Sequence, residues 1–313
     1  MNSALNYPLD SATDYLNTTL NAGIYSFEDW LGMAESMSET LHDERELRAL
    51  ALHVLKFKTP LEKQVALRAL YKRGQAGQLR LDAQRDWSNN ADLNQHCPGI
   101  PDKPELIRAT ETPRRSMNTT EGLAITIHAL AHIEFNAINL ALDAMVRFAG
   151  LSADYYWDWW RVAAEEAYHF SLIQGRLNQL GAQYGDYPAH SGLWDMAERT
   201  KDSFADRMAM VPRTLEARGL DACPVMQEKF RQAGESHTAQ ILDIILRDEI
   251  THVALGHRWF IYACAQNQHE PMREYRRIAE HHRAPRMRPP FNIPARRAAG
   301  FFEEELSAWQ KKK

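Results

Sequence analysis

Near the C-terminal third of the chain, an apolar helical stretch carries three ionisable side chains at its centre. The stretch reads ILDIILRDEITHVALG over residues 241–256, and Asp248, Glu249 and His252 interrupt its apolar pattern. A lone buried carboxylate is strongly disfavoured in a low-dielectric interior unless a neighbouring group neutralises it. The chain is therefore limited to folds in which these side chains reach water or meet a compensating partner.

A second apolar stretch has the same pattern. The segment EEAYH contains Glu165, Glu166 and His169, so both stretches read acid-Glu-x-x-His. At roughly 100° per residue, helix positions three apart differ by roughly 60° in direction, so each Glu and its His share a face. A solvated helix face with salt bridges could explain a single run of this kind. The apolar segments ILDIIL and VALG on either side of Asp248, Glu249 and His252, however, leave little of that helix surface polar. The repetition indicates one shared buried site.

Four long helical stretches, with no β-rich stretch between them, predict an all-α fold. They cover residues 118–150, 152–181, 190–219 and about 236–265. The third contains Pro212, which is expected to kink it, and Gly219, which is expected to end it. A short helical stretch is expected between the third and the fourth. These lengths favour a four-helix bundle.

Two flanking regions surround these helices. Residues 1–117 are predicted to form an N-terminal extension of short helices and loops, and residues 118–265 the bundle itself. Residues 266–313 form a basic, proline-rich tail, which is expected to wrap the bundle as extended chain before a final short helical piece. Its arginines are expected to pair with acids of the bundle rather than with phosphate (Arg283, Arg286, Arg288, Arg296 and Arg297).

The two remaining helices each offer one glutamate at a matching position. Glu134 lies in the first helix and Glu216 in the third. Glu134 precedes Glu166 by 32 residues and Glu216 precedes Glu249 by 33, so the two helix pairs repeat each other. Di-iron carboxylate bundles take a Glu-x-x-His from each of two helices and one Glu from each of the others. Glu216, three residues before Gly219, is expected to bind from a helix end.

Charge balance favours a dinuclear metal centre at this site. Four ionised glutamates and two neutral histidines carry a charge of −4, which two divalent metal ions would cancel. Without metal, the same acids would repel one another and several of their pKa values would be forced upward. Oxygen and imidazole ligands without thiolate suit iron or manganese better than structural zinc. The predicted cofactor is two iron ions, with manganese or a mixed manganese–iron pair as alternatives.

The acid before each of the paired glutamates gains a role in this arrangement. Glu165 and Asp248 lie four residues before His169 and His252, respectively, on the same helix faces. Each is expected to accept the outer ring N–H of a ligating histidine, in particular the histidine across the bundle, and so to hold its tautomer. Zinc proteases need His-Glu-x-x-His, and this chain has an acid in place of the first histidine.

Other reactive side chains are interpreted as structural. His128 and His132 lie on a different side of the first helix from Glu134 and are predicted to be core or supporting histidines. The aromatic run over residues 155–160 is predicted to pack in the interior, and Cys223 to be an ordinary thiol.

Composition limits the class of protein. A net charge of −4 gives no overall reason to expect nucleic acid or an anionic membrane as partner. The three cysteines form no C-x-x-C pair, and the N-terminus has no basic segment followed by an apolar core. Since no run approaches the roughly 18 apolar residues of a membrane span, a cytoplasmic protein without a membrane partner is predicted. A homodimer is left open.

Five stretches carry a family resemblance. HIEFNAINLALD, EEAYHF, LEARGLD, DEITHVALG and PPFN resemble the ferritin-like superfamily and, more narrowly, the bacterial family catalogued as domain of unknown function 455. The resemblance covers roughly residues 95–305. It implies a ferritin-like four-helix bundle and a set of six metal ligands (Glu134, Glu166, His169, Glu216, Glu249 and His252). The wider superfamily includes tRNA hydroxylases, quinone-biosynthesis hydroxylases, fatty-acyl desaturases, ribonucleotide reductase subunits and ferritins.

The predicted function is that of a non-haem di-iron oxidoreductase. It would activate O₂ and hydroxylate an unknown small-molecule substrate, which would reach the centre near the turn expected after Glu216. An iron-handling protein that oxidises or stores Fe(II) without an organic substrate is the alternative, and a purely structural metal is a third. The large terminal additions favour a substrate-specific enzyme. Only the basic tail supports tRNA as a substrate.

Overall fold

The structure, a computed structural model, describes residues 23–33, 41, 43–112 and 116–311 of the 313-residue chain. These residues form helices joined by loops, with two isolated β-bridges (Glu46 to Arg80 and Leu106 to Ala189) and no strand among them. The predicted all-α class is therefore confirmed.

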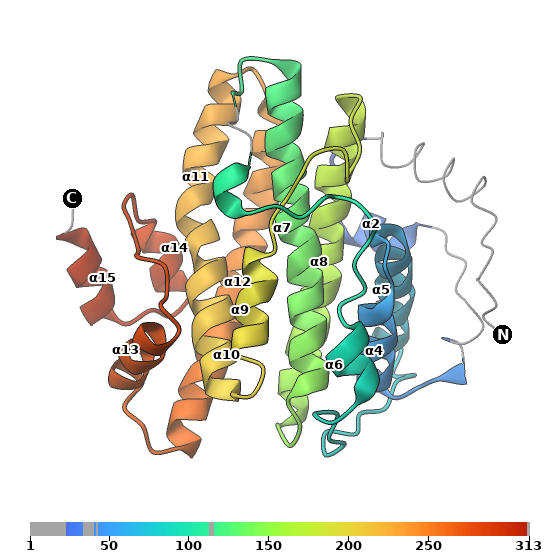
Figure 1. The fold of residues 1–313 in the computed structure, drawn as a ribbon, viewed down its shortest axis with the longest axis vertical. Coiled ribbons are helices and arrows are strands. Elements are labelled where there is room, and N and C mark those ends of the chain that lie inside the picture. The colour runs from blue at the N-terminus through green and yellow to red at the C-terminus, as the bar shows by residue number, and fades with distance from the viewer. Residues whose placement is uncertain (1–22, 34–40, 42, 113–115, 312–313) are drawn as a thin grey trace.

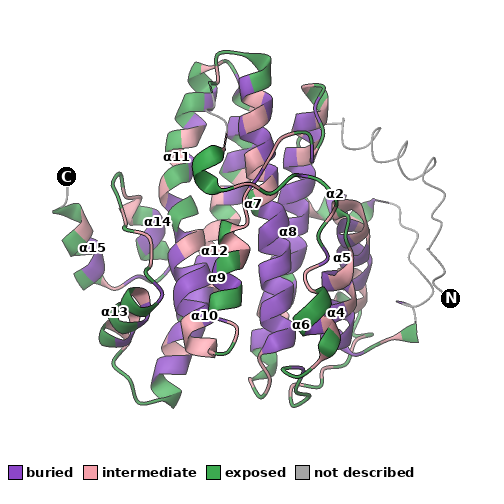
Figure 2. Ribbon diagram, viewed as in Figure 1, coloured by how far each residue is buried: buried purple, intermediate pink, exposed green. Residues whose placement is uncertain are grey.

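Four long helical segments run side by side at the centre of the molecule (Figure 1). They are α7 (Thr120–Arg147), α8 (Ala153–Gln179), α11 (Ala217–Gln232) and α12 (Ser236–Gln266). Helix α7 packs against α8, α8 against α12, and α12 against α11. Figure 2 shows the middle turns of α7 and α8 to be buried, so polar groups there need partners inside the protein.

Local capping signals set the ends of the first two long helices. The Thr119 side chain caps α7 by accepting a hydrogen bond from the backbone N–H of Gly122, whereas Ser152 occupies the N-cap of α8 without a side-chain hydrogen bond. Between these helices, Gly150 has a φ of +77°, a conformation that favours glycine. The predicted ends of α7, α8 and α12 agree with the observed ones within about three residues.

The third predicted helix differs from the observed structure. Helix α9 (Gly192–Arg199) ends at Thr200, whose hydroxyl donates to the carbonyl of Met196. Helix α10 (Phe204–Met210) then leads through a π-helix, η2 (Val211–Glu216), directly into α11. Gly219 lies inside α11, so the prediction that it ends the helix is wrong. A helix-interior glycine costs only about 1 kcal/mol relative to alanine, which packing against α12 outweighs.

Pro212 lies in the first turn of η2, where a break in helical regularity was expected. Proline lacks a backbone N–H and disturbs the hydrogen-bond ladder of a helix. The chain accommodates it by widening one stretch into a π-helix, a feature that often occurs at functional sites. The six residues of η2 end with Glu216, which therefore lies within a continuous helical run rather than at a helix end.

The N-terminal region contributes to the same core as the long helices. Its helices are α2 (Phe27–Gly32), α4 (Leu47–Lys56), α5 (Pro60–Gln75) and α6 (Ala91–His96), followed by a 3₁₀ turn, η1 (Ala109–Glu111). Helix α4 packs against α7, and α5 against α8. The buried Arg48 donates to the carbonyls of Met145 and Val146 at the end of α7. The domain boundary at residue 117 stays a prediction, because one hydrophobic core includes side chains from both sides of it.

The C-terminal tail is mostly helical, so the prediction of an extended tail is wrong. It contains α13 (Pro271–His281), α14 (Ile293–Ala298) and α15 (Glu303–Gln310). Each of the first two begins with a proline in its first turn, a position where the missing N–H costs nothing. Arg296 pairs with Asp221 of α11 as expected, whereas Arg297 pairs with Glu303 inside the tail.

Helix α7 is long and apolar enough to cross a membrane by length and composition, and no other helix of the described ranges is. Its most apolar window is 67% buried within the protein. Such burial is typical of the central helix of a soluble protein.

Candidate metal centre

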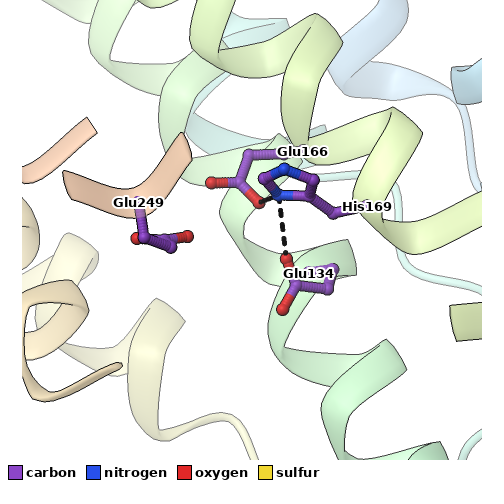
Figure 3. Close-up of side chains that lie close together, drawn as sticks. All are labelled: Glu134, Glu166, His169 and Glu249. Atoms are coloured by element: carbon purple, nitrogen blue, oxygen red, sulfur yellow. Dashed lines mark hydrogen bonds and ion pairs between the residues drawn. The ribbon is translucent and has the colours of Figure 1, made fainter. Parts of the chain in front are cut away.

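Four ligand-type side chains converge near the middle of the long helices. Glu134 comes from α7, Glu166 and His169 from α8, and Glu249 from α12 (Figure 3). One potential ligand atom from each residue lies within 4.8 Å of those of the other three, so this group could hold a metal ion. The structure therefore brings together four of the six predicted ligands in one compact set.

Glu166 lies between two histidines. Its Oε2 atom is 3.3 Å from Nδ1 of His169, and its Oε1 atom is 2.8 Å from Nδ1 of His252 on α12. His169 Nδ1 is also 3.5 Å from Glu134 Oε2, and His252 Nδ1 is 3.7 Å from Glu249 Oε1. His252 thus joins the cluster, and both imidazoles direct the same nitrogen, Nδ1, to the carboxylates.

The outer nitrogens of both histidines bond to acids from the opposite helix. His169 Nε2 lies 3.1 Å from Asp248 Oδ2, and His252 Nε2 lies 2.8 Å from Glu165 Oε2. The contacts expected across the bundle are present in both directions. A carboxylate that accepts the Nε2 proton fixes the tautomer in which Nδ1 is free to bind a metal.

Two arginines, which were not among the predicted site residues, bind the acids behind the histidines. Arg161 Nε donates to Glu165 Oε1 at 2.7 Å, and Arg247 Nε donates to Asp248 Oδ1 at 2.8 Å. Each histidine is therefore the inner end of an arginine–carboxylate–histidine series. The i,i+4 spacing of Arg161 and Glu165 on one helix was a sequence signal that could have indicated the first pair.

Glu216, the sixth predicted ligand, reaches the interior from the last position of η2. Its Oε2 atom is buried and has no hydrogen-bond partner among the described residues. Burial raises the pKa of Glu216 well above its usual value, and the negative charges of Glu249 and Glu166 raise it further. Glu216 is therefore close enough for the charges of the cluster to shift its pKa, although no hydrogen bond or ion pair joins it to the other five side chains in the described part of the chain.

Without metal, the acids of the cluster have opposing pKa shifts. Burial raises the pKa of Glu134 to about 8, and burial together with the Glu166 charge raises that of Glu249. Burial would also raise the pKa of Glu166, but the two histidines outweigh it and lower that pKa. Burial, with added repulsion from neighbouring acids, thus raises three carboxyl pKa values, and the sequence had predicted such upward shifts.

The pKa values of both histidines are raised, although burial by itself would lower them. Burial by itself would lower the pKa of His169, but hydrogen bonds to Asp248, Glu134 and Glu166 raise it well above its usual value. The charge of Glu166 and the contact with Glu165 have the same effect on His252. The metal-free cluster therefore attracts protons where metal ions would otherwise supply positive charge.

The unpartnered oxygens test whether the site fits a metal. Buried polar atoms nearly always have a partner, and those without one call for an unseen ion or water. Oε2 of Glu249 and Oε2 of Glu216 are both buried without a hydrogen-bond partner among the described residues. Carboxylate oxygens and imidazole nitrogens suit iron or manganese. The donor set therefore fits a metal centre, whereas the six ligand roles remain predictions.

The other candidate residues lie outside the cluster. His132 contacts the Tyr184 hydroxyl at 2.9 Å and the His190 carbonyl at 3.1 Å, and His128 accepts from the backbone N–H of Gly185. Both histidines therefore have supporting structural contacts, as predicted. Burial raises the pKa of the Cys223 thiol to about 12, so it is not a reactive thiolate. Because η2 and α11 are continuous, the turn expected beside Glu216 as a substrate route is absent.

Comparison with known proteins identifies relatives without an assigned function. A family model described as "Protein of unknown function (DUF455)" matches residues 56–307, a range that includes all six predicted ligands. A protein of Haemophilus influenzae, described as uncharacterized, is 47% identical over 214 residues, which are 66% of this chain and 74% of the relative. No solved structure matches the chain.

Proposed function

The chain belongs to the DUF455 family, and we propose that it is a non-haem di-iron carboxylate oxidoreductase that activates O₂. Hydroxylation of an organic small molecule is the favoured reaction. One Glu-x-x-His on each of α8 and α12, Glu134 on α7 and Glu216 where η2 joins α11 resemble the ligand distribution of ferritin-like di-iron bundles. This distribution supports a ferritin-like fold for the chain.

The position of Glu166 carries the proposal. Each of its carboxylate oxygens faces Nδ1 of a different histidine, at 3.3 Å for His169 and 2.8 Å for His252. Glu166 and the two imidazoles would together hold the proposed metal centre, because one carboxylate faces ligand atoms of both histidines. A single structural metal would not need both histidines to be oriented by separate carboxylates.

The protein's own side chains would hold and orient the centre. The proposed ligands are the six side chains already described (Glu134, Glu166, His169, Glu216, Glu249 and His252). Asp248 and Glu165 would keep the Nδ1 atoms of the histidines free to bind by holding the Nε2 protons. Bound iron would supply the redox chemistry with O₂. The buried surroundings would exclude bulk water from the centre.

Metal analysis tests the proposal directly. Purified metal-free protein is loaded anaerobically with Fe(II), washed, analysed for iron and then exposed to O₂. We expect two iron ions per chain and a near-ultraviolet oxo-bridge absorption after O₂. Glu166→Gln and Glu249→Gln should lose iron and the absorption. Glu235→Gln, which alters a buried acid bonded to Arg176 outside the cluster, should retain both. At most one iron per chain, unaffected by the two cluster variants, would overturn the proposal.

The iron-handling alternative makes a different prediction in the same protein. An oxygenase consumes O₂ repeatedly when a reductant is supplied, whereas a ferroxidase consumes O₂ in proportion to the Fe(II) added. A 24-subunit cage by light scattering would also favour the alternative. The tail gives tRNA less support as a substrate than expected, because Arg296 is buried in its ion pair with Asp221 and has no exposed surface for a phosphate.

A further inference from the structure

A cleft of about 820 Å³ opens on the outer side of the cluster, and we call it the outer cleft. Its walls come from the segment before and within α2, from α5, and from the facing sides of α8 and α12. Small-molecule sites in proteins have volumes of about 300 to 1,000 Å³. The outer cleft is therefore large enough for a small organic ligand.

Both acids that hold the histidines line this cleft. Glu165 and Asp248 are wall residues, and so are their arginine partners, Arg161 and Arg247. Each histidine directs Nδ1 to the cluster and Nε2 to one of these acids. The imidazole rings therefore stand between the cleft and the cluster. A molecule in the cleft would contact the supports of the histidines, not the interior of the proposed metal centre.

The two arginines retain hydrogen-bond donors for a ligand. Among the described residues, Arg161 bonds to Glu165 through Nε, and Arg247 bonds to Asp248 through Nε and one terminal nitrogen. Their side chains are 55% and 67% exposed. A guanidinium group presents five N–H donors in a fork that matches carboxylate and phosphate oxygens. Each arginine therefore keeps N–H donors that can bind an anionic group in the cleft.

Aromatic side chains also line the cleft. Phe27 packs edge-on against Tyr71 and Tyr168, with ring centroids 5.5 Å apart in both pairs, and Tyr25 lies 6.0 Å from Tyr168. Phe27 and Tyr71 are half-buried, so part of each ring faces the cleft. Such faces favour a planar aromatic ligand. Glu28, the remaining acid of the lining, is exposed, and its charge is screened by water.

We propose that the outer cleft binds a planar aromatic anion, with its ring against Phe27 and Tyr71 and its anionic group on Arg161 and Arg247. The ligand is separate from the molecule oxidised at the metal centre, because the two imidazole rings divide the two sites. The ligand would contact Glu165 and Asp248, the acids that hold the two histidines, and so would influence the metal centre without entering it. Only this role rests on the proposed function, whereas the binding site itself does not need the metal.

Flavin mononucleotide, which combines a planar ring system with a phosphate, is the probe for the test. Metal-free protein is titrated into it, and the quenching of flavin fluorescence gives the dissociation constant. Riboflavin supplies the ring without the anion, and ribose 5-phosphate supplies the anion without the ring. We expect flavin mononucleotide to bind at least about tenfold more tightly than either of them, because it contacts both the aromatic rings and the arginines.

Substitutions of cleft residues test where flavin mononucleotide binds. Arg161→Gln and Arg247→Gln should each weaken binding of flavin mononucleotide by about tenfold and leave that of riboflavin unchanged. Tyr71→Leu should weaken the binding of both. Arg258→Gln is the matched control, because Arg258 is an exposed, ion-paired arginine of α12 outside the cleft. Far-ultraviolet circular dichroism and thermal unfolding show whether each variant is folded.

Equal affinity for flavin mononucleotide and riboflavin, or binding that the two cleft arginine variants leave unchanged, would overturn the proposal. Absence of measurable binding at millimolar probe would do the same. Glu166→Gln should abolish the metal centre but preserve flavin mononucleotide binding. Failure of the proposed function and failure of this site are thus distinguishable.

Discussion

Pro212 of the π-helix lies directly against Gly256 of α12. A β-carbon built on Gly256 would stand 2.3 Å from Pro212 Cβ, a distance that no side chain can adopt without a shift of the neighbouring backbone. Gly256 follows Glu249 by seven residues, so the two lie on the same face of the helix. The missing side chain at residue 256 allows η2 to approach α12 closely, and this approach brings Glu216 towards Glu249.

We predict that Gly256→Ala displaces η2 and weakens metal binding. The added methyl group overpacks this contact, which should lower the free energy of unfolding by about 1 to 3 kcal/mol. Because Glu216 moves with η2, the bound iron per chain should also fall. Urea unfolding of metal-free protein and metal analysis measure the two effects separately. Retention of full iron content by a folded variant would refute the link between the close approach and the site.

Gly219→Ala is the control for this substitution. Gly219 lies in α11, three residues after Glu216, and a β-carbon there would meet no atom within 4 Å. Alanine should stabilise the helix by up to about 1 kcal/mol and leave metal content unchanged.

Removal of the acids behind the histidines should weaken metal binding without removing a ligand. Asp248→Ala and Glu165→Ala are each expected to reduce metal affinity by about 10- to 100-fold, because the imidazoles lose their orienting partners. Competition with a chelator of known affinity measures the change. Asp158→Ala serves for comparison, since Asp158 of α8 accepts a hydrogen bond from Trp259 of α12 and lies outside the cluster. Equal affinities in all three variants would contradict an orienting role.

The tail helix α15 should contribute to stability through one buried ion pair. Arg213 of η2 donates to both carboxylate oxygens of Glu305, at 2.8 and 2.7 Å, and both side chains are buried. Glu305→Gln leaves the arginine charge uncompensated and should cost about 3 to 5 kcal/mol in unfolding experiments. Glu303→Gln, which alters an exposed pair on the same helix, should have little effect. Similar losses of unfolding free energy in the two variants would be evidence against a stabilising role of the buried Arg213–Glu305 pair.

Lys63 predicts a pH dependence of stability. Its ammonium group is buried and donates to the carbonyls of Val54 and Leu55, and burial lowers its pKa from 10.5 to about 7. Between these two values the unfolded chain binds more protons than the folded one, so the free energy of unfolding should rise with pH.

Lys63→Met removes this titration. Relative to the variant, the wild-type protein should gain stability between about pH 7 and about pH 10, as measured by urea unfolding at several pH values. Parallel pH profiles for the two proteins would exclude Lys63 as the source.

Local sequence patterns could predict most of the helices but not all of their ends. The cap that Thr119 forms with Gly122 and the positive φ of Gly150 are local features, so their signals were readable, and Ser152 marks the start of α8 without a side-chain hydrogen bond. Gly219 carries the same kind of local signal, yet α11 continues through it because α12 packs alongside. The tail was predicted from its prolines to be extended, but in α13 and α14 the prolines lie at helix starts, where they favour a helix.

The sequence by itself determined the helical class and the set of buried acids and histidines, because helix periodicity puts Glu166 with His169, and Glu249 with His252, on single faces. It also indicated that the acids before them would reach across the bundle, as they do. Only the tertiary structure decided that Glu216 sits in a π-helix held against Gly256. It alone decided that Arg161 and Arg247 meet at one cleft behind the histidines. These features depend on contacts between residues far apart in the chain, and no local spacing encodes such contacts.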